Sequence, residues 1–117
     1  MEITELRVGN IISSKSAKSP FEVTVSDFEY INEHIDNYLS VEITDKILNK
    51  FGFEKIIGWA DQIYYREKDW REKGCSFFEL QLNEKDFIFT DFNNIIIESV
   101  HQLQNLFFAL TNNELTL

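Results

Sequence analysis

The fold is decided by the stretch Ser76-Phe77-Phe78-Glu79-Leu80-Gln81-Leu82-Asn83. Apolar and polar residues alternate along it, which is the period-two pattern of a strand with one buried face. Phe78, Leu80 and Leu82 point to that face. A turn-forming run, Asn83-Glu84-Lys85-Asp86, separates this strand from two more apolar runs at 87–90 and 95–98. The three runs predict an antiparallel meander.

A helix is predicted directly after the meander, from Val100 to Leu110. Ser99 is the expected N-cap, and Asn112-Asn113 can adopt the left-handed conformation that ends a helix. One continuous stripe carries the apolar residues, at helical spacing: Val100, Leu103, Leu106, Phe107 and Leu110. We therefore expect this helix to pack on the sheet built from residues 76–98.

The first half of the chain predicts shorter elements. Alternating apolar residues over 21–25 indicate a strand, and residues 38–43 indicate another. Thr44 is expected to cap a short helix, Asp45 to Phe51, which ends at Gly52. These elements predict an α+β fold. Its parts are a small antiparallel sheet with a strand-rich N-terminal half and a C-terminal meander, a short middle helix, and a C-terminal helix packed on the sheet.

Length and composition indicate one globular domain, residues 1–117. The chain is 44% hydrophobic, contains four glycines and one proline, and has no linker-like stretch. Its net charge of −9 argues against binding to nucleic acid polymers and to anionic membranes. A single cysteine, no apolar run near the length of a membrane span and no signal-like start predict a cytoplasmic protein.

A search for catalytic motifs finds no phosphate-binding loop, nucleophile elbow or metal-ligand cluster. His34, His101 and Cys75 are too few to form a structural zinc site. We therefore predict no catalytic residue, no metal and no cofactor. One enzymatic alternative stays open, a hydrolase built from carboxylates, for which the candidates are Glu79, Asp86 and Asp91.

The segment Gln62–Lys73 mixes aromatic rings with cations, which is the combination that a nucleotide-like anion requires. Rings stack on a base, and guanidinium groups bind phosphate through two parallel hydrogen bonds. The alternative is a salt-bridged surface loop, because Glu67, Asp69 and Glu72 nearly cancel the bases. The candidate ligand-binding residues are Tyr64, Tyr65, Arg66, Trp70 and Arg71.

A second face of the C-terminal helix lies opposite its apolar stripe. The residues expected on this face, and proposed for protein contact, are His101, Gln104, Asn105 and Phe108. Phe108 is hard to bury in the same stripe as Phe107, and a large exposed apolar side chain favours a partner. We therefore expect a homo-oligomer.

Three stretches carry a family resemblance: Glu5–Asn10, Ile43–Phe53 and Val100–Thr111. They resemble small uncharacterised proteins of Bacteroides-type bacteria, their prophages and phages, which share a Leu-Arg-Ile-Gly-Asn start and a His-Gln-Leu-Gln-Asn-Leu helix. Asn112 stands where those proteins usually have glycine. The resemblance implies a mobile-element setting and an accessory role, and it supplies no catalytic residues.

Together, the residues and the resemblance predict a non-catalytic viral accessory protein that acts by binding. The sharper form of this hypothesis is an anti-defence protein that sequesters a nucleotide-like signal in the host cytoplasm. The alternative is an adaptor or inhibitor that binds a host protein through the C-terminal helix.

Overall fold

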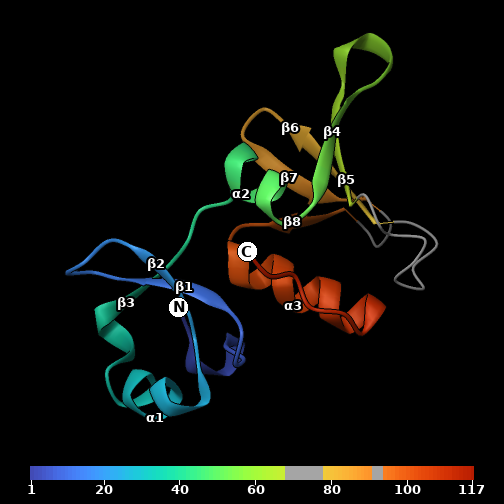
Figure 1. Cartoon of the computed structure of the whole chain (residues 1–117). Helices are drawn as coiled ribbons and strands as arrows, with labels where there is room; N and C mark the ends of the chain where they lie inside the picture. The colour runs from blue at the N-terminus through green and yellow to red at the C-terminus, as the bar shows by residue number, and fades with distance from the viewer. Residues whose placement is uncertain (68–77, 91–93) are drawn as a thin grey trace.

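The computed structural model of the chain describes residues 1–67, 78–90 and 94–117 (Figure 1). Its helices are α1 (Val25–Glu33), α2 (Asp45–Lys50) and α3 (Val100–Thr111), with short 3-10 turns η1 (Ile3–Glu5), η2 (Ile35–Asn37) and η3 (Trp59–Asp61). The strands are β1 (Ile11–Ser14), β2 (Pro20–Glu22), β3 (Tyr38–Ser40), β4 (Phe53–Ile57), β5 (Ile63–Glu67), β6 (Glu79–Asn83), β7 (Asp86–Phe89) and β8 (Ile95–Ile97). None of the helices in these ranges is long and apolar enough to cross a membrane.

The strands form two antiparallel sheets, which confirms the α+β class. The smaller sheet has the order β2-β1-β3, and the larger one has the order β4-β5-β6-β7-β8. The predicted meander is confirmed as β6, β7 and β8, with Leu80 opposite Phe89 and Phe87 opposite Ile97. Thr44 caps α2 as expected, accepting a hydrogen bond from the Ile47 N–H, and Gly52 has the left-handed φ of 94°.

Helix α3 packs on the five-stranded sheet through the predicted stripe. The Ser99 hydroxyl caps it by accepting from the Gln102 N–H, and Asn112 ends it with a φ of 59°. Leu103 and Phe107 are fully buried, and the Phe107 ring meets the edge of Phe78 at 4.9 Å between ring centres. Leu110 is 40% exposed, so the expectation that it joins the packed stripe is wrong.

Strand β1 lies between two separate apolar cores. Ile11 belongs to the larger core, which fills the space between the five-stranded sheet and α3. Its neighbour Ile12 points the other way into a smaller core with Val23 and Ile31, between the three-stranded sheet and α1. Because successive side chains of a strand face opposite sides, these two isoleucines make β1 the shared wall of both cores.

Two regions differ from the sequence-based expectation. The alternation over 21–25 stops at β2, and Val25 begins α1 instead of ending a strand. Hydrogen bonds to Asp27 explain this, because its carboxylate accepts from both the Thr24 N–H and the Thr24 hydroxyl and so caps the first turn of α1. Residues 53–67 form a hairpin, β4–β5, that projects from the larger sheet (Figure 1).

We predict that Leu103→Ala lowers the free energy of unfolding by about 2–5 kcal/mol, because it removes a fully buried side chain and leaves a cavity. Leu110→Ala makes the same change on the same helix at an exposed position, and should cost less than about 1 kcal/mol. Urea denaturation of both variants measures the difference. Equal losses would show that the helix does not pack through Leu103.

Candidate functional site

The proposed ligand-binding segment is split by strand β5. Tyr65 and Glu67 point into the core, while Tyr64 and Arg66 point to the opposite face of the sheet. The Tyr65 hydroxyl donates to Asp45 Oδ1 at 2.7 Å, and burial raises the pKa of Tyr65 to about 12. Tyr65 is therefore a core residue and not a stacking platform, which corrects that expectation. Trp70 and Arg71 lie outside the described residues.

Arg66 is engaged by a carboxylate on the next strand. Its Nη2 and Nε atoms donate to Glu79 Oε2 at 2.7 and 3.0 Å. Glu79 is one of the three carboxylates named as candidates for a hydrolase site, and here it is paired with Arg66. Asp86 starts the following strand and lies opposite Asn83. Asn83 is four residues, or about 13 Å, along β6 from Glu79. Asp91 lies outside the described residues. Glu79 and Asp86 are therefore too far apart to act on one bond.

The face of α3 proposed for protein contact is covered by the chain's own N-terminal segment. His101 and Gln104 are buried, which corrects the expectation of an exposed face. The Gln104 amide accepts from the Ile11 N–H at 2.8 Å and donates to the carbonyls of Gly9 and Leu115, both at 3.0 Å. This side chain therefore ties α3 to the start of β1 and to the C-terminal tail.

Arg7 covers the remainder of that face. Its Nε donates to Asn105 Oδ1 at 2.8 Å, and its Nη1 forms an ion pair with Glu114 at 2.7 Å. The guanidinium carbon lies 4.4 Å from the centre of the Phe108 ring, within the range of a cation–π contact. Phe108 therefore has a contact inside its own chain, and the argument that it requires a second copy no longer holds.

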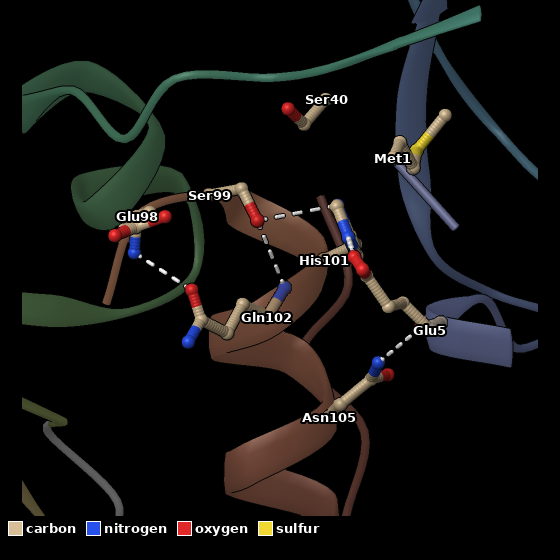
Figure 2. A pocket seen from close by; sticks show the side chains of 8 residues that line it. All are labelled: Met1, Glu5, Ser40, Glu98, Ser99, His101, Gln102 and Asn105. Atoms are coloured by element: carbon tan, nitrogen blue, oxygen red, sulfur yellow. Dashed lines mark hydrogen bonds and ion pairs between the residues drawn. The ribbon is translucent and has the colours of Figure 1, made fainter. Parts of the chain in front are cut away.

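A polar cleft of about 600 Å³ opens at the N-terminus of α3 (Figure 2). Its centre holds a chain of three side chains: the Ser99 hydroxyl lies 3.3 Å from His101 Nδ1, and His101 Nε2 lies 3.2 Å from Glu5 Oε2. The hydrogen bond from His101 holds the pKa of Glu5 below its usual value. Met1, Ser40 and Glu98 also line the cleft.

Hydroxyl, imidazole and carboxylate are the groups of a nucleophilic triad, but their geometry here fits another role. The Ser99 oxygen already accepts from the Gln102 N–H as the cap of α3. General-base catalysis uses hydrogen bonds of about 2.6–3.2 Å. The Ser99–His101 distance of 3.3 Å exceeds this range, and the His101–Glu5 distance of 3.2 Å equals its upper end. We assign these residues to fastening the N-terminal segment onto α3. Among residues 1–67, 78–90 and 94–117, no group of three His, Cys, Asp or Glu side chains is placed to hold a metal ion.

The most exposed large apolar side chain of the described residues is Trp59, at the tip of the β4–β5 hairpin. Trp59 is 92% exposed, and Ile57, which precedes it on the same hairpin, is 68% exposed. Trp59 is not among the candidate residues predicted from the sequence, because the segment considered there begins at Gln62. The signal was available in Gly58-Trp59-Ala60-Asp61, a turn-like run between two apolar stretches.

The tip is held in a strained turn. Ala60 and Asp61 have φ values of 58° and 60°, and the Gln62 N–H donates to the Trp59 carbonyl at 3.3 Å. Left-handed backbone costs a non-glycine residue about 1–2 kcal/mol. Gly58 makes room beside the turn, because a Cβ there would stand 3.0 Å from Tyr64 Cε2. The hairpin therefore presents Trp59 on a defined backbone.

We predict that Ala60→Gly raises the free energy of unfolding by about 0.5–1 kcal/mol, because glycine adopts a φ of 58° without strain. The control is Ala109→Gly, at an exposed position of α3 with ordinary helical backbone, which should lose about 1 kcal/mol. Thermal and urea denaturation measure both. Destabilisation by both substitutions would show that Ala60 is not strained.

We predict that Glu5 stabilises the fold in a pH-dependent way. Its pKa is lowered in the folded chain, so the unfolded chain binds a proton more readily and stability rises with pH through this range. Wild type should exceed Glu5→Gln in stability at pH 6, and the difference should vanish as pH falls below 4.5 through the folded pKa of Glu5. Glu2→Gln is the control, and a pH-independent difference for Glu5→Gln would contradict the His101 contact.

No protein-family model matches this chain, and no curated protein and no solved structure matches it either. No residue role therefore passes to the chain from a relative, and the case for its function rests on the side-chain geometry described above.

Proposed function

We propose that this protein acts by binding another protein, with the β4–β5 hairpin as the anchor. The observation that carries the proposal is the 92% exposure of Trp59 at the tip of a hairpin that projects from the larger sheet (Figure 1). Tryptophan is enriched among the few residues that dominate protein interfaces. An exposed indole on a strained, defined turn is ready to enter a pocket with little further ordering.

The outer face of the five-stranded sheet supplies area beside the anchor. A stable interface covers about 800 Å² on each partner, which is more than one side chain provides. One cross-strand row runs over this face with a residue from each strand, namely Ile56, Tyr64, Gln81, Ile88 and Ile96. These side chains are half-buried or exposed, and the row begins within the hairpin itself, because Ile56 lies on β4 and Tyr64 on β5.

The net negative charge of the protein favours one class of partner over others. The net charge of −9 repels nucleic acid and anionic lipid, whereas it attracts a basic protein surface and speeds its approach. Asp61 is exposed in the turn itself. We therefore propose a protein partner with an apolar pocket for Trp59 and lysine or arginine residues around that pocket.

This proposal replaces two earlier forms of the binding hypothesis. The α3 face can no longer serve as the adaptor surface, because it is occupied by residues 5–11 and the C-terminal tail. Of the residues proposed to bind a nucleotide-like signal at 62–73, Tyr65 is buried and Arg66 is paired with Glu79. The accessory role in a phage or prophage, implied by the resemblance, remains part of the proposal as its setting.

We predict that Trp59→Ala abolishes partner capture without unfolding the protein. Immobilised wild type, Trp59→Ala and Val25→Ala would be incubated with extract of the cells that encode the chain, and bound proteins identified by mass spectrometry. Val25 is the control because it is 78% exposed on α1, away from the hairpin. A protein retained by wild type and Val25→Ala and lost with Trp59→Ala is the expected partner.

The purified partner then gives the decisive measurement. Truncation of a central tryptophan anchor costs at least about 2 kcal/mol, so Trp59→Ala should weaken the dissociation constant about 30-fold or more. Asp61→Asn should slow association and reduce its dependence on salt. A partner that binds Trp59→Ala as tightly as wild type would overturn the proposal, provided that both chains have the same melting temperature.

A further inference from the structure

A second cleft, of about 360 Å³, lies between the β1–β2 turn, α1 and η2 in the smaller sheet region. Its walls carry hydrogen-bond donors from β1, the β1–β2 turn, α1, η2 and β3, namely Ser14, Lys15, Ser16, Tyr30, Asn37 and Tyr38. The turn is fixed from both sides, because the Lys15 N–H donates to the Asn37 carbonyl at 2.9 Å and the Ala17 N–H donates to the Ser14 hydroxyl at 2.9 Å. This cleft is separate from the hairpin and from the cleft at α3.

The cleft holds a local excess of positive charge on an acidic protein. Lys15 and Lys18 lie in a run, Ser13 to Phe21, that contains no acidic residue. Among residues 1–67, 78–90 and 94–117, no ion pair engages the Lys15 ammonium. Of the residues that line the cleft, Lys15 is the one with a charged side chain. An ammonium with two neighbouring hydroxyl groups, Ser14 and Ser16, matches the acceptors of a phosphate group.

A fixed aromatic ring lies beside these donors. The Tyr30 ring stacks on His34, with ring centres 4.2 Å apart and planes 22° from parallel, and His34 is held by a 2.9 Å hydrogen bond to the Tyr30 carbonyl. Tyr30 remains 58% exposed, so ring surface is available for a further flat group. Tyr38 also lines the cleft, and its hydroxyl is protonated at neutral pH like that of an ordinary tyrosine.

We propose that this cleft binds a nucleoside monophosphate, with the phosphate on Lys15 and the serine hydroxyls and the base on Tyr30. A phosphate alone would use only the turn, and an uncharged nucleoside would use only the ring. Base stacking on an aromatic side chain and charge-assisted phosphate bonds each contribute independently. A ligand that joins both groups is the one that uses both the charged turn and the ring.

The experiment is a titration of the full-length protein with AMP, adenosine, ribose 5-phosphate and inorganic phosphate, followed by amide NMR shifts and by calorimetry. AMP should bind best and shift the amides of Lys15 and Asn37, with each partial ligand at least about tenfold weaker. Lys15→Met should weaken AMP binding about tenfold, because it removes the charge and keeps the length of the side chain.

Lys18→Met is the matched control, since Lys18 lies in the same turn but does not line the cleft. It should change the AMP dissociation constant less than about twofold. Equal weakening by Lys15→Met and Lys18→Met would show nonspecific charge attraction and overturn the proposal. So would AMP binding that survives Tyr30→Leu unchanged, shifts confined to other regions, or no binding up to about 10 mM AMP.

Discussion

The arrangement of the two sheets depends on the buried side chain of Gln104. Its amide bonds the Ile11 N–H, the Gly9 carbonyl and the Leu115 carbonyl, so it joins α3 to the smaller sheet and to the C-terminal tail. A buried polar group left without its partner costs about 1–3 kcal/mol, so the position of β1 along the helix is tightly specified. The opposite face of α3 packs on the larger sheet, so this amide, together with Ile11 in the larger core, fixes how the smaller sheet is placed against it.

The two terminal motifs of the sequence are halves of one hydrogen-bond network. Glu5, Arg7 and Asn10 come from the first motif, and His101 and Asn105 come from the second, about 95 positions later. Asn105 accepts from Arg7 and Asn10 and donates to the Glu5 carbonyl. The residues of the two terminal stretches that carry the resemblance therefore have a structural explanation, and the binding surfaces proposed for the chain lie elsewhere on the molecule.

How much the sequence predicts depends on whether a signal is local. The meander and α3 were predictable because alternation at 78–82 and helical spacing at 100–107 leave little choice of element. Alternation at 21–25 was misleading, since the cap formed by Thr24 and Asp27 ends the strand after β2. The burial of Gln104 was not predictable, because a polar residue opposite an apolar stripe normally faces solvent, and two of its three partners lie more than 90 positions away in the chain.

Charge and exposure together explain how a free Trp59 is tolerated. An exposed indole on a projecting hairpin favours self-association, since two such tips would bury apolar surface against each other. A charge of −9 on every copy opposes that contact, and the repulsion acts over a screening length of about 8 Å at physiological salt. With a basic partner the long-range electrostatic interaction would be attractive instead of repulsive, and Trp59 could still bury its apolar surface at the contact. For the protein partner proposed above, the acidic surface would therefore oppose contact between like copies and favour contact with a basic surface.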